Sequence, residues 1–190
     1  MTNRGPFKIT GSREVYHNRW LRIREDQVIR PDGSAGIFGL VEMKSGSSVI
    51  AIDRDFNLVL GKEFKYGINR ESLETLSGAI EEGETPLEAA KRELEEETGN
   101  IASEWIDLGV IDPFTTVIHS PNYMFLAMKL SAGTVSLDPG EIVDVVSVPF
   151  REAIRMVLDS RITHGASCVG ILKAARYLQD HGLLTDLPTG

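Results

Sequence analysis

Cysteine is nearly absent from this sequence, since Cys168 is the only one among 190 residues. A single thiol excludes an intramolecular disulfide framework and every zinc site that is built from several cysteines. Such sparse use of cysteine is typical of a reducing compartment, so we expect a cytoplasmic location. Cys168 itself is expected to be a small packing residue rather than a nucleophile.

Long apolar runs and an excess of positive charge are also lacking. No stretch approaches the ~20 apolar residues of a membrane span, and residues 1–20 contain no apolar run of signal-peptide length. We therefore expect no membrane association. The 20 Lys and Arg residues against 28 Asp and Glu residues give a net charge of −8. Without a basic stripe, nucleic-acid binding through phosphate neutralisation is not expected, and a phosphate-bearing ligand would need another source of attraction.

The first forty-odd residues favour extended structure. Residues 20–24 and 27–29 alternate crudely, 31–33 (Pro-Asp-Gly) have turn chemistry, and 36–43 form a second run. This pattern predicts an antiparallel β extension at the N-terminus.

The rest of the chain interleaves strands and helices without strict alternation, which predicts an α+β fold with a mixed sheet flanked by helices. A polar connection is expected over residues 62–71. Hydrophobic runs predict strands, and helical periodicity predicts helices. The predicted strands cover 47–53, 58–60, 105–110, 123–130 and 143–148, and the predicted helices cover 86–98, 151–158 and 167–178.

The strongest helical signal lies at residues 86–98. Thr85 is a good N-cap, Pro86 stands at the first helical position, and Glu88 is placed to close a capping box. Gly99 supplies the stop, because glycine readily takes the left-handed conformation that ends a helix. The apolar stripe of this helix comprises Leu87, Ala90 and Leu94.

Three carboxylates crowd one face of this helix near its C-terminus. At ~100° per residue, Glu93, Glu96 and Glu97 span about 100°, with only the small Ala89 one turn before them. Each like-charged pair at this spacing costs roughly 0.2–0.5 kcal/mol, and acids in a last turn oppose the helix dipole. One explanation is a solvated glutamate face. A solvated face does not account for carboxylates that cluster at the C-terminal end, where the helix dipole disfavours them. Such an unfavourable placement of charge in an otherwise well-formed helix indicates a functional site.

A hard divalent cation would resolve this conflict. Mg²⁺ prefers oxygen ligands and is commonly held by a few carboxylates together with substrate phosphates. A bound cation would also allow an acidic protein to hold a polyanion. Arg92 lies four residues before Glu96, so an ion pair could orient that carboxylate; a plain surface salt bridge is the alternative.

The pattern around this helix resembles the Nudix box. Only Asn100 departs from it, where an aliphatic residue is expected. Flanking segments are similar to the ADP-ribose and nucleoside-diphosphate-sugar pyrophosphatase branch of that superfamily. The box residues are Gly78, Glu84, Arg92, Glu93, Leu94, Glu96, Glu97 and Gly99, and the flanking segments are 63–66, 74–78, 105–109, 125–127 and 162–166.

The resemblance implies a fold and an assembly. Residues 45–190 are expected to form the Nudix domain, an α/β/α sandwich with a mixed sheet. Residues 1–44 are expected to form the β extension, which pairs or swaps across a homodimer in this branch.

The resemblance also implies an activity. The expected reaction is hydrolysis of the pyrophosphate bond of ADP-ribose or a related nucleoside-diphosphate sugar, with Mg²⁺ or Mn²⁺. The implied metal ligands are Glu93, Glu96, Glu97 and the backbone carbonyl of Ser77. Arg92 and Glu96 are expected in the catalytic machinery.

Three residues carry expectations for the substrate and the proton: Glu141, Lys65 and Gly78. A loop carboxylate often assists in this branch, and Glu141 is the best-placed candidate, with an exposed loop acid as the alternative. Lys65 stands where the branch usually has arginine, and it is expected to bind substrate together with Gly78. Because Thr75-Leu76-Ser77 replaces the commoner Leu-Pro-Ala, these contacts can differ from those of the branch.

Two aromatic residues lie in the N-terminal segments where the branch often stacks the nucleobase. Trp20 and Phe38 are candidates for that role, and plain core or interface packing is the alternative. His119, in the polar stretch 115–122, is a candidate lid residue or simply an exposed histidine.

Two other functions remain open at this point. One is a Nudix enzyme for a nucleoside triphosphate or a dinucleotide, against which the long N-terminal β segment counts. The other is a non-catalytic nucleotide sensor. Degenerate binders usually lose a box carboxylate or the arginine, and here Arg92, Glu93, Glu96 and Glu97 are all present.

Overall fold

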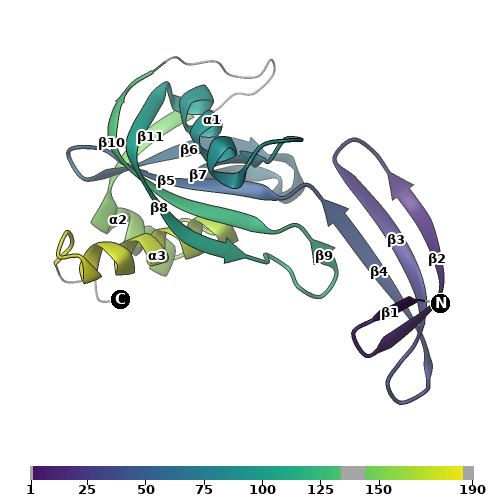
Figure 1. The fold of residues 1–190 in the computed structure, drawn as a ribbon. Helices are drawn as coiled ribbons and strands as arrows, with labels where there is room; N and C mark the ends of the chain where they lie inside the picture. Colours follow the sequence, from purple (N-terminus) through teal and green to yellow (C-terminus); the bar gives the residue numbers. More distant parts are fainter. Residues whose placement is uncertain (1, 134–143, 186–190) are drawn as a thin grey trace. The chain divides into compact units, whose positions relative to one another are not determined.

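The computed structural model describes residues 2–133 and 144–185. Its contacts divide the chain into two compact units. The first comprises Met1–Ser45 and Asp112–Pro121, and the second comprises Gly46–Ile111 and Asn122–Gly190. Each unit is built around its own sheet (Figure 1).

The first unit is a five-stranded sheet in the order β1-β2-β3-β4-β9. β1 to β4 are antiparallel, and β9 adds in parallel to β4. Gly33 makes the turn between β3 and β4 with φ +84°, a conformation that suits glycine. The antiparallel extension expected from the sequence is therefore confirmed. The strands are β1 (Thr2–Arg4), β2 (Phe7–His17), β3 (Leu21–Ile29), β4 (Ala35–Met43) and β9 (Ile118–His119).

The second unit contains a six-stranded sheet in the order β11-β6-β7-β5-β10-β8. β5 and β10 are parallel and the other pairs are antiparallel, so the sheet is mixed as predicted. Its strands are β5 (Gly46–Ile52), β6 (Asn57–Lys65), β7 (Arg70–Ala79), β8 (Asn100–Ile111), β10 (Asn122–Ala132) and β11 (Asp144–Pro149).

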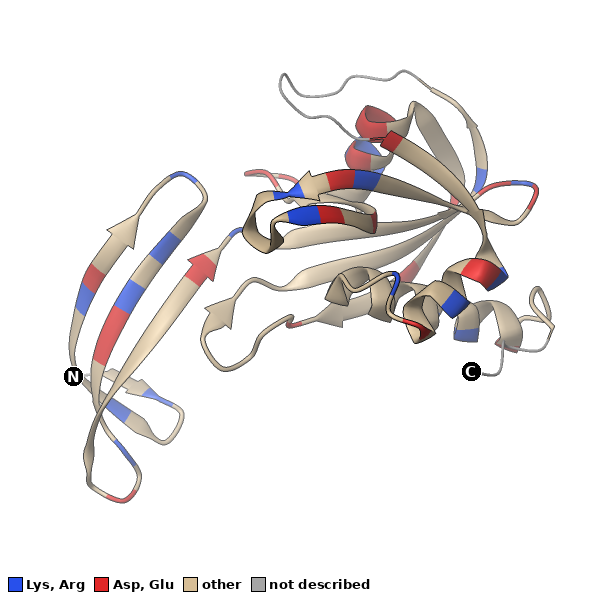
Figure 2. Ribbon diagram, turned by 180° about the vertical axis from the view of Figure 1, so that it is seen from behind, with Lys and Arg blue, Asp and Glu red and all other residues tan. Residues whose placement is uncertain are grey.

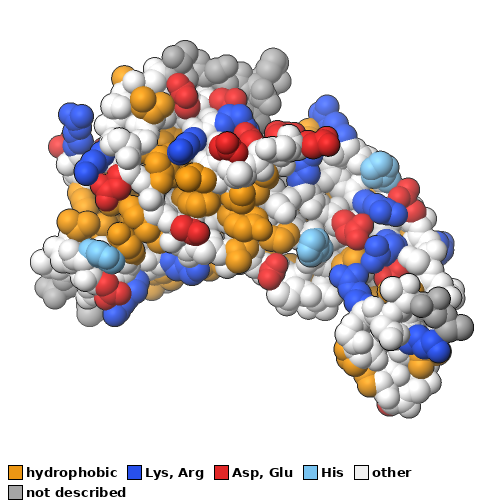
Figure 3. Space-filling view, in the orientation of Figure 1, with side chains coloured by type: hydrophobic (Ala, Val, Ile, Leu, Met, Phe, Trp, Pro, Cys, Tyr) orange, Lys and Arg blue, Asp and Glu red, His pale blue; other side chains and the backbone are white. Residues whose placement is uncertain are grey.

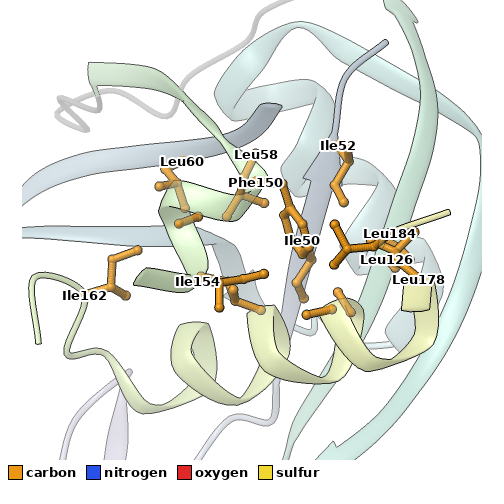
Figure 4. Packing of buried hydrophobic residues seen from close by; sticks show 14 of the residues in the cluster. Ile50, Ile52, Leu58, Leu60, Leu126, Phe150, Ile154, Ile162, Leu178 and Leu184 are labelled. Atoms are coloured by element: carbon orange, nitrogen blue, oxygen red, sulfur yellow. The ribbon is translucent and has the colours of Figure 1, made fainter. Parts of the chain in front are cut away.

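Helices cover both faces of this second sheet (Figure 1). α1 (Pro86–Thr98) packs through Ala90 and Leu94 on one face. α2 (Phe150–Leu158) and α3 (Gly165–Asp180) pack on the other, around Phe150, Ile154 and Leu178 (Figure 4). Burial of apolar side chains on both faces makes the α/β/α sandwich, so the predicted fold class is confirmed. None of the helices in the described part of the chain has both the length and the apolar character to cross a bilayer.

The polar connection predicted over residues 62–71 was wrong. β6 continues to Lys65 and β7 begins at Arg70, with the short 3₁₀ turn η1 (Tyr66–Ile68) between them. Lys65 and Arg70 are directly paired across the hairpin, and Lys62 Nζ lies 2.8 Å from Glu71 Oε2. The ion pair between Lys62 and Glu71 joins the two strands without apolar alternation, so hydrophobic periodicity could not detect this hairpin.

β7 changes partners along its length. Its last residues, from Leu76 to Ala79, pair with β5, whereas Arg70 to Thr75 pair with β6. The backbone N–H of Thr75 donates instead to Ser167 Oγ of α3, at 2.9 Å. A side chain in the first turn of α3 therefore accepts the hydrogen bond of β7 at the fork, the point where β5 and β7 separate.

Apolar side chains also remain on the surface of the second unit, where Figure 3 shows them gathered on one face. Ile101 and Val110 of β8 and Leu172 of α3 are among the exposed large hydrophobic residues. Among the residues that the structure describes, β8 is an edge strand that pairs with β10 alone. The homodimer expected from the sequence remains a prediction.

Candidate active site

The helix that carries the acidic face has both of its predicted ends. Thr85 Oγ1 accepts from the backbone N–H of Glu88, and the Glu88 carboxylate accepts from the backbone N–H of Thr85. Gly99 closes the helix with φ +66°. These local signals fix the register of α1, and the register decides which carboxylates share a face.

Arg92 is the hub of the acidic face. Its Nη1 donates to Glu93 Oε1 at 2.7 Å and to Glu96 Oε2 at 2.9 Å, which confirms the predicted pair with Glu96. Its Nε donates to Glu84 Oε1 at 2.8 Å, and its Nη2 donates to the carbonyl of Ala79 at 3.0 Å. One guanidinium therefore ties α1 to the end of β7 and to the loop between them. Figure 2 shows the acidic segments gathered on α1.

The charges of this hub shift the ionisation of its members. The hydrogen bond from Arg92 holds the pKa of Glu84 below its usual range. Hydrogen bonds to Glu84, Glu93 and Glu96 raise the pKa of Arg92 despite its partial burial, so the guanidinium stays charged at all working pH values. Arg92 thus offsets the repulsion that the carboxylates would otherwise feel.

Gly78 makes room for a carboxylate. A Cβ added at this position would overlap the carboxylate of Glu93. The side chain of Glu93 is 13% exposed and lies against β7. Glycine is required here because of this close approach, and the result is a carboxylate held next to the backbone that follows Ser77.

The donor set suits a hard cation. The carboxylates of Glu93, Glu96 and Glu97 share a face of α1. The space left by the missing Cβ of Gly78 lets the Glu93 carboxylate lie against β7. Within residues 2–133 and 144–185, no three Asp, Glu, His or Cys side chains converge on one point as ligands. In this arrangement Arg92 Nη1 contacts both Glu93 and Glu96. The chemistry of these oxygen donors fits a hard divalent cation.

The buried side of α1 includes Ala89, the small residue one turn before the carboxylates. Ala89 is fully buried, as are Ala90 and Leu94, whereas Leu87 is only half-buried. The buried stripe of α1 is therefore wider than predicted, because α1 contacts β5, β7, β8 and β10 together.

Lys65 lies at the end of β6 within the electrostatic reach of the acidic face. Its Nζ is 2.5 Å from Glu63 Oε2 and 4.0 Å from Glu74 Oε2. Burial opposes its charge, but the hydrogen bond to Glu63 and the charges of Glu74 and Glu97 raise the pKa of Lys65. A permanently charged lysine next to the carboxylates is suited to contact a diphosphate.

Two residues near Lys65 were missed by the sequence analysis. Glu74 is 14% exposed, and its Oε2 lies 3.3 Å from Nδ1 of His164, the N-cap residue of α3. Both residues fall in segments that resemble the branch, but β6, β7 and α3 bring them together only in the folded chain. No local pattern could have joined them.

The predicted aromatic residues belong to the first unit. Trp20 is 60% exposed in the turn after β2, with the Arg19 guanidinium 3.9 Å from its ring centroid. Phe38 of β4 stands edge-on to Phe7, with ring centroids 5.1 Å apart, and it lines a cavity of about 370 Å³. The exposed His119 lies on β9. Base stacking by either aromatic ring stays a prediction, and Glu141 lies outside the described residues.

Two family descriptions match the chain. "NUDIX domain" matches residues 44–165, and "Nucleoside diphosphate sugar hydrolase N-terminal domain" matches residues 7–41. The first covers more than half of the chain, and it contains the whole of α1 and β7.

Curated relatives and a solved structure align with nearly the whole chain. The "ADP-ribose pyrophosphatase" of Bacillus subtilis is 28% identical over 180 residues, which cover 90% of this chain and 92% of the relative. The "Methanol dehydrogenase activator" of Bacillus methanolicus is 26% identical over 176 residues, with the same coverage of 90% and 92%. A solved structure titled "Crystal structure of ADP compounds hydrolase" superposes with a TM-score of 0.85 at 19% identity, covering 97% of this chain and 100% of that one. This last likeness shows that the fold is shared.

Proposed function

This chain belongs to the NUDIX domain family and is a Nudix pyrophosphohydrolase; from that premise we propose that its substrate is ADP-ribose or a related nucleoside-diphosphate sugar. The match of residues 7–41 to a nucleoside diphosphate sugar hydrolase N-terminal domain carries this choice of substrate. The ADP-ribose pyrophosphatase similar to this chain along 90% of its length supports it.

The reaction adds water across a phosphoanhydride. The water oxygen bonds to one phosphorus, the bridging P–O bond breaks, and the products are a nucleoside monophosphate and a sugar phosphate. When bound, Mg²⁺ or Mn²⁺ neutralises charge on the diphosphate and lowers the pKa of a bound water. Glu93, Glu96 and Glu97, with the carbonyl of Ser77, would hold the ion.

The residues of the chain supply positioning and charge. Arg92 orients Glu93 and Glu96 through its Nη1, and its bonds to Glu84 and to the carbonyl of Ala79 anchor it. Lys65 contacts the diphosphate as a point charge, which is less directional than the arginine usual in this branch. Glu141 remains the predicted acceptor of the proton that the attacking water loses.

A substrate panel tests the proposal. The purified chain is assayed with Mg²⁺ on ADP-ribose, ADP-glucose, GDP-mannose and a nucleoside triphosphate, and the products are identified by ³¹P NMR. We expect a nucleoside monophosphate and a sugar phosphate from at least one nucleotide sugar, at a higher kcat/KM than for the triphosphate. Preference for the triphosphate would assign another Nudix substrate. Binding without turnover of any compound would make the chain a sensor.

A further inference from the structure

The mechanism above leaves the half-buried imidazole of His164 without a role. The carboxylate of Glu74 lies near both this imidazole and the ammonium of Lys65, with its Oε2 3.3 Å from His164 Nδ1 and 4.0 Å from Lys65 Nζ. The segment that precedes α3 is also tied to the hairpin of β6 and β7, because Arg70 Nη2 donates to Thr163 Oγ1 at 2.9 Å. These contacts place the imidazole close to the ammonium that is proposed to contact the diphosphate.

One hydrogen bond orients the imidazole. His164 Nδ1 lies 2.8 Å from Oγ of the fully buried Ser167. The same Oγ accepts from the backbone N–H of Thr75 at 2.9 Å and lies 3.1 Å from Thr75 Oγ1. Because β7 fixes this hydroxyl, it also fixes the Nδ1 edge of the ring. Within the described part of the chain no residue hydrogen-bonds Nε2, and the His164 side chain is 34% exposed.

The position of the imidazole proton follows from these neighbours. A hydroxyl accepts two hydrogen bonds and donates one, so Ser167 can either accept from Nδ1 or donate to it. The carboxylate of Glu74, 3.3 Å from Nδ1, decides between the two, because its negative charge attracts a proton on this nitrogen and repels a lone pair. Nδ1 is therefore the donor to Ser167, and Ser167 donates its own proton to Thr75 Oγ1.

The ring as a whole is neutral at pH 7. Burial lowers the pKa of His164, Glu74 opposes this shift, and the positive charge of Lys65 adds to it. A neutral imidazole with its proton on Nδ1 has a lone pair on Nε2, which accepts and cannot donate. The free edge of His164 is therefore a hydrogen-bond acceptor close to a cationic side chain.

An acceptor at this place distinguishes between the parts of a substrate. Ionised phosphate oxygens only accept hydrogen bonds, so they match the ammonium of Lys65 but not Nε2 of His164. A sugar hydroxyl can donate, and in a nucleoside-diphosphate sugar the sugar is bonded directly to the diphosphate. A ligand whose diphosphate lies at Lys65 can therefore offer a hydroxyl to His164, whereas the third phosphate of a triphosphate offers only acceptors.

We propose that Nε2 of His164 accepts a hydrogen bond from a hydroxyl of the sugar attached to the diphosphate, which makes His164 a specificity residue for nucleotide sugars over nucleoside triphosphates. The discrimination has an attractive and a repulsive part, because a phosphate oxygen in the same place would bring two acceptors together. This inference rests on the proposed function, whose substrate class it explains, and on the proposed role of Lys65.

Binding without turnover tests the assignment. Calorimetric titrations in EDTA compare ADP-ribose with ADP and GDP-mannose with GDP, at about pH 8, where a terminal phosphate is ionised and only accepts. We expect His164→Ala to weaken binding of the nucleotide sugar in at least one pair about three- to tenfold, the effect of one hydrogen bond, without weakening binding of the matched diphosphate. His181→Ala, a replacement of the exposed histidine after α3, is the control and should change none of the four affinities.

Two replacements separate the acceptor from a structural role of the ring. His164→Asn places an amide N–H near the position of Nδ1, so it can keep the hydrogen bond to Ser167, but it has no atom at the position of Nε2. It should bind the nucleotide sugar as weakly as His164→Ala. His164→Gln can place its amide oxygen near the position of Nε2 and should recover most of the affinity. Thermal melting of each variant reports whether the fold is retained.

The possible outcomes are distinct. Wild-type affinity of His164→Asn for the nucleotide sugars would show that only the bond to Ser167 matters, and it would overturn the proposal. Equal losses for sugar and diphosphate in His164→Ala, unchanged affinity for all four ligands, or no binding of either sugar by the wild type would also contradict it. Binding that depends on both the sugar and His164 supports the inference even if no nucleotide sugar is hydrolysed. Hydrolysis by His164→Ala with wild-type affinity would leave the proposed function standing without it.

Discussion

Glu93 lies in the space that a side chain at position 78 would fill, so Gly78 and Glu93 are a matched pair across β7 and α1. The glycine contributes by lacking a Cβ, and the glutamate contributes a carboxylate that is 13% exposed. Arg92 holds the same carboxylate from the helix side. The acidic face is therefore built by packing as well as by helical register, and Figure 3 shows acidic and basic side chains side by side over α1.

Gly78→Ala should displace the Glu93 carboxylate while the chain still folds, because the overlapping atoms are the end of a flexible side chain. We expect kcat/KM to fall by about 100-fold, the effect of a misplacement near 1 Å in an active site. Gly67→Ala is the matched control, since a Cβ there meets nothing within 4 Å. Steady-state kinetics and thermal melting compare kcat/KM and the melting temperature of the two variants. Equal kcat/KM would show that the close approach of Glu93 to Gly78 does not matter for activity.

Arg92→Lys should destabilise the second unit and impair turnover. A lysine cannot reach Glu84, Glu93, Glu96 and the Ala79 carbonyl at once, and loss of these hydrogen bonds to partly buried acceptors should cost about 1–3 kcal/mol. Urea denaturation measures the loss. Arg176→Lys is the control, because its pair with Asp180 is exposed and its replacement should cost less than about 0.5 kcal/mol. Similar losses in the two variants would argue against a hub at Arg92.

Ser167→Ala should leave the backbone N–H of Thr75 without a partner at the fork of β7. We expect a loss of about 1–3 kcal/mol in the free energy of unfolding, since Ser167 is fully buried. The exposed Ser103 of β8 offers a neutral control as Ser103→Ala. Chemical denaturation measures the free energy of unfolding of both variants. Equal values would mean that another group accepts the hydrogen bond of the Thr75 backbone N–H.

Glu84 should make the free energy of unfolding depend on pH in the acidic range. The hydrogen bond from Arg92 lowers its pKa in the folded state from the ordinary value of 4.5. This contribution is therefore fully present above pH 4.5 and is lost as the pH falls through the lowered folded-state value. The stability difference between the wild type and Glu84→Gln should shrink over that window. Urea denaturation at pH 7 and at steps below pH 4.5 measures it; a constant difference would contradict the account.

Local signals predicted α1 well. Thr85, Pro86, Glu88 and Gly99 act within a few residues of each helix end, so the sequence alone fixed its bounds of 86–98 and its acidic face. The hairpin of β6 and β7 was missed because cross-strand charge pairs such as Lys62 with Glu71 stabilise it. Such pairing leaves no periodic apolar pattern.

The contacts around Lys65 could not be predicted for a different reason. Lys65, Glu74 and His164 come from three elements, and a contact of 3.3 Å between Glu74 and His164 depends on how α3 enters the fork of β7. Ser167, which anchors this entry, carries no motif of its own. These contacts depend on the packing of segments that are distant in the sequence, and local sequence patterns carry no information about such packing.

The central claim is that the carboxylates of α1 act by holding a divalent cation. The most direct measurement compares release of AMP from ADP-ribose by the wild type and by Glu97→Gln, each with millimolar Mg²⁺ and with EDTA. We expect turnover only in the presence of Mg²⁺, at a rate about 100-fold or more lower in Glu97→Gln than in the wild type, although the two proteins have the same melting temperature in EDTA. Equal turnover by both proteins, or turnover that persists in EDTA, would contradict the account.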